Sequence, residues 1–279
     1  MRAATLSLSI SLFAFLLLAA GCQESGQGEL AVSLPATCFE PEPRVIEASP
    51  QPARRPVVAE VPPPAGRSVQ GRPLQCFVAG DGGETVLILG GIHGNEPAGV
   101  PLCEQLYLYL RAHPDQRSGR RVVIAPALNP DGLAMDRRAN AHGVDLNRNF
   151  RTANRRNCAR FGLQPLSEPE SRYVARLIDR YRPCRIVTIH QPLACVDWDG
   201  PGEGLAAAMA RACGLPHKRL GARPGSLGSF AGEDRHIPTV TLELPRDATD
   251  DTPAQLWQRY GRALLVAIGH PAAAADLAK

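Results

Sequence analysis

The chain has 279 residues, of which 44% are hydrophobic and 21% are charged, and this composition suits one ordinary globular core with some chain left over. The formal net charge of +4 is mild, and the arginines are scattered without the dense runs or interleaved aromatic residues of nucleic-acid-binding proteins. We therefore expect one folded domain with an appendage, and no nucleic-acid partner.

The beginning of the chain has the pattern of a targeting segment. Arg2 supplies a positive start, Leu6 to Ala20 form an apolar run, and Gly21 adds a small residue after it. The run contains serines and falls short of the roughly 20 apolar residues that span a bilayer, so a permanent transmembrane helix is the weaker alternative. We predict a signal peptide at residues 1–22 and export to the periplasm.

The end of this segment, Leu18-Ala19-Ala20-Gly21-Cys22, also resembles the bacterial lipobox, in which the cysteine becomes the lipid-bearing first residue of the mature protein. The lipobox normally carries Leu three residues before the cysteine, and Ala19 stands at that place here. We expect a lipid on Cys22 to anchor the chain to a membrane, with ordinary cleavage and release as the alternative.

Residues 23–69 are predicted to form a linker, because prolines such as Pro35, Pro50 and Pro62 interrupt every possible helix and no apolar periodicity survives between them. Such a segment is semi-extended and would space a folded domain from the membrane. An unstructured leader without a role is the alternative interpretation.

Cysteine usage is compatible with export. The chain has 8 cysteines, so an odd number remains beside Cys22 and these cannot all pair within one chain. No close CxxC pair suggests a structural zinc site. We expect one or two disulfides, whose partners the sequence does not assign.

Residues 70–272 carry the regular pattern of a folded domain, and residues 273–279 form a tail. Short apolar runs predict buried strands, and segments with helical spacing lie between several of them. This alternation predicts an α/β fold with a mixed, largely parallel central sheet flanked by helices. The predicted strands are Leu74–Val78, Thr85–Leu89, Val122–Ala125, Ile186–Ile189 and Thr239–Leu242, and the predicted helices are Ala98–Leu110, Glu168–Tyr181, Gly204–Cys213 and Pro253–Ile268.

The first group of chemical interest follows the predicted strand Thr85–Leu89. The strand runs into two glycines, and His93 and Glu96 come next, three residues apart. If a helix begins here, with Asn95 near its cap and Pro97 in its first turn, both side chains can face one ion. An isolated pair of this kind more often belongs to a solvated helix start, so a metal site needs a third ligand.

His190 and Glu243 stand at comparable places, each at the end of another predicted strand. Open α/β sheets place their sites beyond the carboxyl ends of strands, so we expect the residues at these three strand ends to lie at the same edge of the sheet. Zinc in hydrolases typically takes three protein ligands and leaves a fourth place for water, and two His with one Glu are an established set. The sequence predicts a Zn²⁺ site at His93, Glu96 and His190 with Glu243 as a base, although a lone His after a strand is more often structural.

Longer motifs fill the segments Asn129–Gly132, Arg138–Phe150, Ser167–Glu170, Ile189–Cys195, Pro224–Phe230 and Leu242–Pro245. Together they resemble the signature of the zinc carboxypeptidases of the carboxypeptidase A superfamily. Within that superfamily the motifs are most similar to the murein peptide amidases, which cleave the γ-D-glutamyl to meso-diaminopimelate bond in peptidoglycan peptides. The resemblance extends over roughly residues 71–270.

The resemblance implies a role for each residue at the strand ends. It makes His93, Glu96 and His190 the zinc ligands and Glu243 the general base and acid. In such a site zinc lowers the pKa of water towards about 7, and a carboxylate can take the water proton and return it to the leaving amine.

Three residues of the longer motifs are given substrate roles by the same resemblance. Asn147 and Arg148 fall on the pair that binds the terminal carboxylate of the substrate, and a planar guanidinium can hold a carboxylate with two parallel hydrogen bonds. Arg138 corresponds to the arginine of the amidase RxN motif, to which we assign stabilisation of the developing oxyanion. Arg137 lies beside it and would take this role if the loop register differed; solvated surface charges are the alternative for both.

Two positions depart from the pattern. Carboxypeptidases place a tyrosine on the lid ahead of the glycine-serine segment, yet Leu215 to Phe230 contains none. The amidases carry an acidic residue directly after the third zinc ligand, where this chain has Gln191. A changed partner beside a ligand would tune the metal and could shift the choice of substrate.

These observations predict an exported, membrane-anchored zinc metallopeptidase that hydrolyses an amide bond next to a C-terminal residue, with murein peptides as the expected substrate. One alternative is an N-acyl amino acid deacylase of the desuccinylase type on the same scaffold. A second is a non-catalytic lipoprotein that binds peptidoglycan peptides. The sequence leaves the oligomeric state open.

Overall fold

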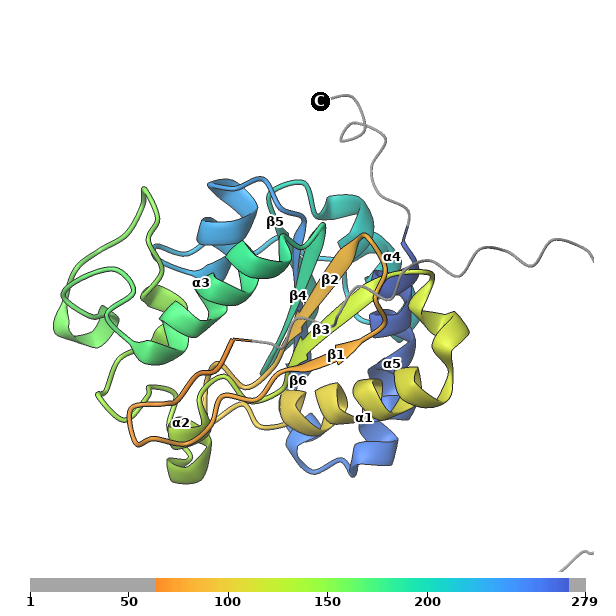
Figure 1. The fold of residues 1–279 in the computed structure, drawn as a ribbon, viewed down its shortest axis with the longest axis horizontal. Coiled ribbons are helices and arrows are strands. Elements are labelled where there is room, and N and C mark those ends of the chain that lie inside the picture. Colours follow the sequence, from red (N-terminus) through yellow and green to blue (C-terminus); the bar gives the residue numbers. More distant parts are fainter. Residues whose placement is uncertain (1–63, 271–279) are drawn as a thin grey trace, which may run out of the picture. The chain divides into compact units, whose positions relative to one another are not determined.

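The computed structural model describes residues 64–270, and these contain one six-stranded sheet with the strand order β1-β3-β2-β4-β6-β5 (Figure 1). Four inner strands run parallel, and both edge strands run antiparallel to their neighbours. The predicted α/β fold with a mixed, largely parallel sheet is therefore confirmed. In chain order the strands are β1 (Phe77–Ala79), β2 (Thr85–Leu89), β3 (Arg121–Ala125), β4 (Arg185–His190), β5 (Leu193–Asp199) and β6 (Thr239–Pro245).

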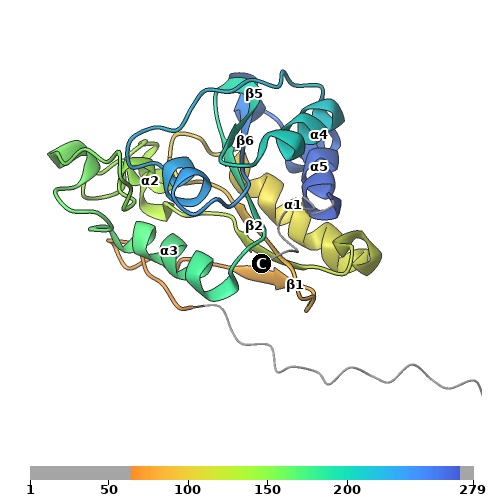
Figure 2. The ribbon, with the colours of Figure 1, turned by 90° about the horizontal axis from the view of Figure 1, so that it is seen from above.

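Helices cover both faces of this sheet (Figure 2). The helices α1, α4 and α5 pack on one face, and α3 packs on the other together with α2 and the long loops. The α-helices are α1 (Gly99–Ala112), α2 (Pro130–Met135), α3 (Pro169–Tyr181), α4 (Glu203–Cys213) and α5 (Pro253–Gly269); five shorter helical segments are η1 (Pro114–Arg117), η2 (Leu146–Arg148), η3 (Ala159–Phe161), η4 (Gly228–Glu233) and η5 (Arg246–Thr249).

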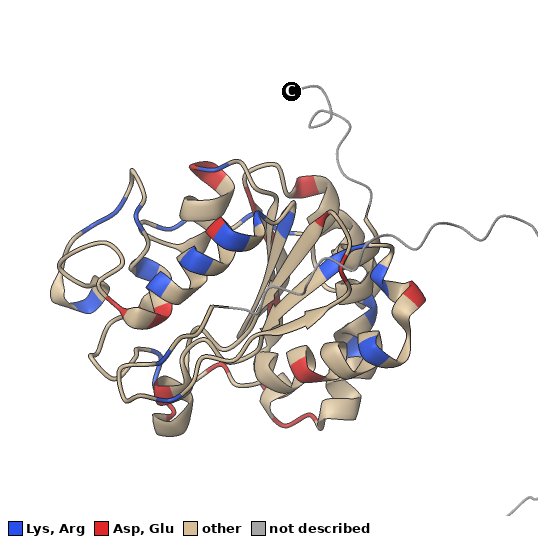
Figure 3. Cartoon of the chain, viewed as in Figure 1, with Lys and Arg blue, Asp and Glu red and all other residues tan. Residues whose placement is uncertain are grey.

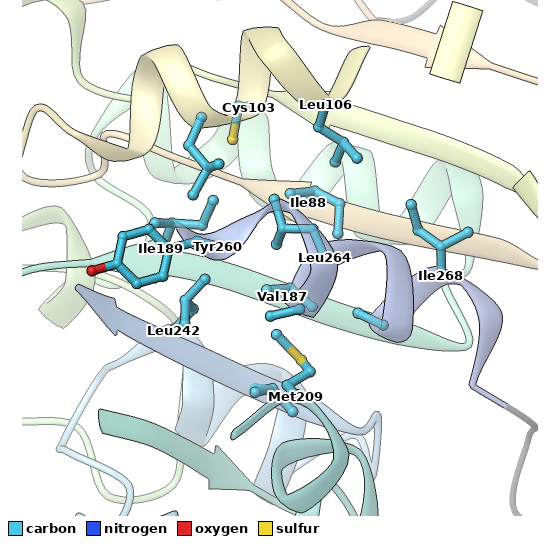
Figure 4. Packing of buried hydrophobic residues seen from close by; sticks show 14 of the residues in the cluster. Ile88, Cys103, Leu106, Val187, Ile189, Met209, Leu242, Tyr260, Leu264 and Ile268 are labelled. Atoms are coloured by element: carbon cyan, nitrogen blue, oxygen red, sulfur yellow. The ribbon is translucent and has the colours of Figure 1, made fainter. Parts of the chain in front are cut away.

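The core on the α1, α4 and α5 side explains why the inner strands are continuous apolar runs. Every side chain of β2 is buried, because helices cover both faces of the sheet. On this side Ile88 and Val187 from the sheet meet Leu106 of α1 and Leu264 of α5 (Figure 4). Burial of one such side chain contributes about 1.5–3 kcal/mol, so this layer holds the strand ends in fixed positions.

One strand and several short elements were absent from the sequence prediction. The edge strand β5 was missed, although Val196 and Trp198 alternate with two aspartates as a half-buried strand requires. The first strand is shorter and later than predicted, because the described chain from Leu74 onward pairs with β3 only at Phe77–Ala79.

The domain begins earlier than residue 70. Ser68 donates from its hydroxyl to Asp131 at 2.8 Å, and the amide of Val69 donates to Glu170 at 3.1 Å. Residues 64–69, which we assigned to the linker, therefore contact the domain. The predicted signal peptide, the lipid on Cys22, residues 23–63 of the linker and the tail at residues 273–279 lie outside the described residues.

The cysteines and the apolar character of the helices bear on the predicted export and anchoring. The six cysteines between residues 64 and 270 are free thiols, so none of the expected disulfides forms among them. Cys103 lies in α1, Cys195 in β5 and Cys213 at the end of α4, whereas the other three lie just outside the regular elements. Over the same part of the chain, no helix combines the length and apolar character needed to cross a membrane.

Candidate active site

The segment between β2 and α1 carries the first two candidate ligands. It forms a turn in which the amide of Glu96 donates to the carbonyl of His93 at 3.2 Å, and the helix starts only at Gly99. The hypothesis of a helix start near Asn95 is therefore wrong, whereas the predicted helix from Ala98 agrees with α1 to within one residue at its start. The chain must turn tightly first, because a Cβ at Gly94 would lie 1.9 Å from the backbone of Gly132.

His93, Glu96 and His190 meet at the carboxyl ends of β2 and β4. The Nδ1 atom of His93 lies 2.9 Å from Oε1 of Glu96, and the Nδ1 atom of His190 lies 2.8 Å from Oε2 of the same carboxylate. The two Nδ1 atoms are 3.2 Å apart. All three side chains are buried, and their ligand atoms lie within 4.8 Å of one another. We call this group the metal end of the pocket.

The chemistry of these donors fits zinc. Two imidazole nitrogens and one carboxylate oxygen make the three-ligand set of catalytic zinc sites, and all three residues line the pocket from which water could reach a bound ion. Burial by itself would raise the pKa of Glu96, but hydrogen bonds and charges from His190 and His93 hold that pKa far below its usual value. The carboxylate is therefore kept ionised, which is the form that binds a cation.

Asp145 supports the metal end from behind. Its Oδ1 atom lies 3.3 Å from Nε2 of His93, and its Oδ2 atom accepts from Nε of Arg138 at 2.9 Å. Such a partner on the outer nitrogen fixes the orientation of a ligand histidine. Burial opposes ionisation of Asp145, yet His93 and Arg138 together lower its pKa.

Arg138 lines the same pocket and has a second partner there. Its Nη1 atom donates to Oε1 of Glu96 at 3.0 Å, in addition to its bond to Asp145. Its guanidinium therefore braces the carboxylates around the metal end, and only its remaining N–H groups can face a substrate. Arg137, its neighbour, is exposed.

Asn147 and Arg148 line the pocket from η2. Asn147 accepts the amide of Leu227 at 2.8 Å, which joins η2 to the glycine-serine segment. A glycine is required at position 225, because its φ is +72° and a Cβ there would lie 2.3 Å from the carbonyl oxygen of Arg148. The backbone of Arg148 is thus held close to the pocket, which its side chain lines.

The surroundings of Arg148 are strongly positive. Burial lowers its pKa first, and the nearby charges of Arg138, Arg223 and Arg160 lower it further, against the attraction of Asp145. More arginines follow in residues 151–160, seen as blue stretches on the loops at the left of Figure 3. A cleft wall with one sign of charge attracts a substrate of the opposite sign, in this case a carboxylate.

Glu243 lies beside the metal end on β6. It pairs in register with His190, so both side chains stand on the same face of the sheet. The side chain is 9% exposed, and burial raises its pKa above the usual value for a glutamate. A carboxyl group with a raised pKa is suited to accept a proton and to return it.

The two departures from the expected pattern have different structural outcomes. Gln191 accepts the amide of Ala98 at 3.0 Å and donates to Thr249 at 2.9 Å, so its side chain anchors the start of α1 rather than a metal ligand. Its own amide donates to Glu96 at 3.2 Å. On the lid side, Leu220 and Arg223 line the pocket, and none of the described lining residues is a tyrosine.

The pocket that joins these groups has a volume of about 430 Å³. It lies over the half of the sheet formed by β4, β6 and β5, where one face carries polar side chains in place of the apolar ones on β2 and β3. Four of these polar lining residues escaped the sequence prediction: Thr188, Asp197, Asp199 and Thr241. The alternation of acidic and apolar residues at Val196–Asp199 was the signal that could have found the two aspartates.

A buried His-Glu-His group beside a buried carboxylate, at the carboxyl ends of strands in a largely parallel sheet, defines a metallohydrolase of the α/β type. The family model described as zinc carboxypeptidase matches residues 56–196. The chain belongs to the zinc carboxypeptidase family and is an enzyme of the metallopeptidase type.

Similar proteins agree with this assignment. Murein peptide amidase A of Escherichia coli (strain K12) is 37% identical over 205 residues, which cover 67% of this chain and 82% of that protein. The crystal structure of a murein-tripeptide amidase from Escherichia coli O157 matches with a TM-score of 0.61 and 33% identity, over 76% of this chain and 95% of that one. The carboxypeptidase A of Helicoverpa armigera shares the fold, with a TM-score of 0.64 at 20% identity over 77% and 68% of the two chains.

Proposed function

We propose that this enzyme is a zinc-dependent amidase that removes the C-terminal residue from murein peptides by hydrolysing the γ-D-glutamyl to meso-diaminopimelate bond. The observation that carries the proposal is the meeting of a His-Glu-His group, Glu243 and Arg148 in one pocket. The names of the amidases that match most of the chain support the substrate class.

His93, Glu96 and His190 would hold the zinc ion. At such a site zinc supplies polarisation of the scissile carbonyl and a lowered pKa for water. Glu243 accepts the proton of the attacking water and returns it to the leaving amine. The free N–H groups of Arg138 are placed to donate to the oxygen on which negative charge develops.

Arg148 and Asn147 select the end of the chain. The guanidinium of Arg148 holds the terminal carboxylate of the substrate in a positive region of the pocket, and Asn147 lies next to it. A substrate without a free carboxylate leaves the half-buried Arg148 without an anion, so the enzyme acts as an exopeptidase.

The test is incubation of the zinc-loaded mature protein with L-alanyl-γ-D-glutamyl-meso-diaminopimelate, followed by identification of the products. We expect free diaminopimelate and the dipeptide. Glu243→Gln keeps the shape of the side chain and should keep zinc, but should lower kcat by about 10²–10⁴-fold. Near-normal turnover of this variant would remove Glu243 from the mechanism.

The same experiment separates the alternative functions. Release of the acyl group from N-succinyl amino acids, without cleavage of the peptide, would indicate a deacylase on this scaffold. Binding of the tripeptide with zinc in place but no cleavage would indicate a non-catalytic peptide-binding protein.

We further propose that the chain is exported to the periplasm and anchored to a membrane through a lipid on Cys22. The apolar run from Leu6 to Ala20 followed by Cys22 supports this proposal. Cys22→Ser should move the protein from the membrane fraction to the soluble fraction. Equal partition of the parent and the variant contradicts the anchor.

A further inference from the structure

A short closed turn at the start of the described chain lies beside α2 (Figure 1). The amide of Leu74 donates to the carbonyl of Gly66 at 2.9 Å, and the amide of Ser68 donates to the carbonyl of Arg72 at 2.8 Å. Residues 66–74 therefore close on themselves, and we call them the strap. The strap overlaps the end of the predicted linker, so it is the part of the domain nearest in sequence to the expected tether.

Asp131 of α2 receives three donors from the strap. The hydroxyl of Ser68 donates to its Oδ1 atom at 2.8 Å, and the amide of Gln70 donates to its Oδ2 atom at 2.9 Å. Nη1 of Arg72 lies 2.5 Å from Oδ1. Burial by itself would raise the pKa of Asp131, but these three partners lower it. Asp131 is thus kept as a buried carboxylate, and within residues 64–270 its hydrogen-bond partners all belong to the strap.

The short helix α2 has little else to hold it in place. Of its 6 residues only Asp131 and Gly132 are buried, and none belongs to the hydrophobic cores on the two faces of the sheet. A helix of this length has marginal stability by itself. Asn129 caps it by accepting the amide of Gly132 at 2.9 Å. The position of α2 therefore depends on polar contacts, and Asp131 makes those that reach the strap.

The backbone of α2 contacts the turn that carries two residues of the metal end. A Cβ at Gly94, which follows His93, would lie 1.9 Å from the carbonyl carbon of Gly132. Asn129, at the start of the same helix, donates from Nδ2 to the carbonyl of Arg138 at 3.4 Å. Asp131 itself has no hydrogen bond to the metal end within the described residues. Its influence on that site must therefore pass through the backbone of α2.

We propose that Asp131 is a positioning residue for the metal end. By tying α2 to the strap, it holds the backbone of Gly132 against Gly94 and so fixes the turn that presents His93 and Glu96. The inference rests on the proposed function, since these are two of the ligands proposed for zinc. Ligands that are already ordered lose less conformational entropy when an ion binds. Loosening the strap should therefore loosen the turn and speed the loss of zinc, although no ligand is changed.

The first test measures hydrogen exchange in the metal-free protein. Asp131→Asn keeps the shape of the side chain but removes its charge and one acceptor oxygen. We expect the amides of residues 90–97 to exchange about tenfold to hundredfold faster than in the parent, the range for losing hydrogen bonds to a buried charge. The amides of α5, on the other face of the sheet, should change far less. Equal acceleration in both segments, or none in residues 90–97, overturns the proposal.

Two further variants sharpen this measurement. Ser68→Ala removes one of the three donors, 63 positions away along the chain from Asp131, and should accelerate exchange in residues 90–97 by about twofold to tenfold. This smaller change also decides the question if Asp131→Asn does not fold. Asp136→Asn is the matched control, because it removes an exposed carboxylate at the end of the same helix. If it accelerates exchange as much as Asp131→Asn does, the contact with the strap is not the cause.

The closing experiment follows zinc itself. Zinc-loaded parent and variant proteins are mixed with a colorimetric chelator, and the rate of metal transfer is recorded. Asp131→Asn should release zinc about tenfold faster than the parent, as expected for a lost partner behind the ligands, and Asp136→Asn should match the parent. Equal rates in Asp131→Asn and the parent contradict the proposal. A parent that binds no zinc would contradict the proposed function instead, and exchange in the metal-free protein would still decide whether Asp131 positions the turn.

Discussion

At the metal end of the pocket, His93, Glu96 and His190 are in contact with one another and with Asp145 and Arg138. Asp197 and Asp199 line another part of the pocket, which we call the acidic end, and the Oδ1 atom of Asp199 has no hydrogen-bond partner within residues 64–270. Both ends lie on the same face of the sheet, and both are buried. The difference is that the first group is organised by partners within the chain. The carboxylate of Asp199 is enclosed by the backbone of Gly228 and Gly232 and forms no ion pair within residues 64–270.

This comparison separates a part of the site that is organised by contacts within the chain from a part that is not. A network with internal partners is preorganised, because its geometry does not depend on the substrate that arrives. A buried carboxylate without a complete set of partners instead carries a free-energy cost in the folded state.

The largest expected effect comes from the metal end. His190→Ala removes a ligand from β4 and should reduce the zinc content from about one ion per chain to almost none, with activity falling in parallel. The fold should survive, since the cores on both faces of the sheet do not include His190. The measurement is metal analysis together with circular dichroism.

His113→Ala is the matched control, because this histidine is exposed at the end of α1. It should retain zinc and activity. Stoichiometric zinc in His190→Ala would show that this residue is not a ligand, and the division of the pocket into two ends would lose its basis.

A second change acts on Gly225, whose backbone lies against that of Arg148 in the pocket wall. Gly225→Ala places a methyl group against the carbonyl of Arg148 at a φ of +72°. We expect a loss of about 2–4 kcal/mol in the free energy of unfolding, from backbone strain and overpacking together. The Michaelis constant for a free-acid peptide should also rise, because Arg148 is displaced.

Gly214→Ala isolates the backbone contribution. Gly214 has a φ of +70°, and a Cβ there meets nothing within 4 Å. Its loss of stability, followed by urea denaturation, should be about 1 kcal/mol and leave the Michaelis constant unchanged. If both variants lose the same free energy of unfolding, the close approach of Gly225 to Arg148 makes no contribution to stability.

The smallest expected effect concerns stability at the acidic end. Because folding raises the pKa of Asp199 to about 7, the folded state binds a proton that the unfolded state has already released between about pH 4 and pH 7. Its contribution to stability therefore falls as the pH rises through this window. The groups that face Asp199 are Asp197, Glu233 and Arg219.

Asp199→Asn removes this penalty and should raise the free energy of unfolding by about 1–2 kcal/mol at pH 8, with little change near pH 4. Denaturant titrations of parent and variant at both pH values provide the measurement. A variant that is less stable than the parent at pH 8 would show that the carboxylate has an internal partner after all.

The sequence predicted most of the fold because its signals are local. The inner strands are buried on both faces and read as apolar runs, and α5 begins at a capping box formed by Thr252 and Gln255. The edge strand β5 was missed because only one of its faces is apolar. The hypothesis of a helix start near Asn95 failed because the turn there is set by contact with Gly132, far away along the chain.

By itself, the sequence determined the class of fold, the family and the candidate residues at the strand ends, since each of these is written in short motifs and in the spacing of apolar residues. Only the tertiary structure decided which side chains share a cavity, because a register of strands fixes the face on which each residue stands. It also decided that Arg138 braces Glu96 and that Oδ1 of Asp199 has no hydrogen-bond partner in the described part of the chain, as both depend on contacts between segments distant in the chain.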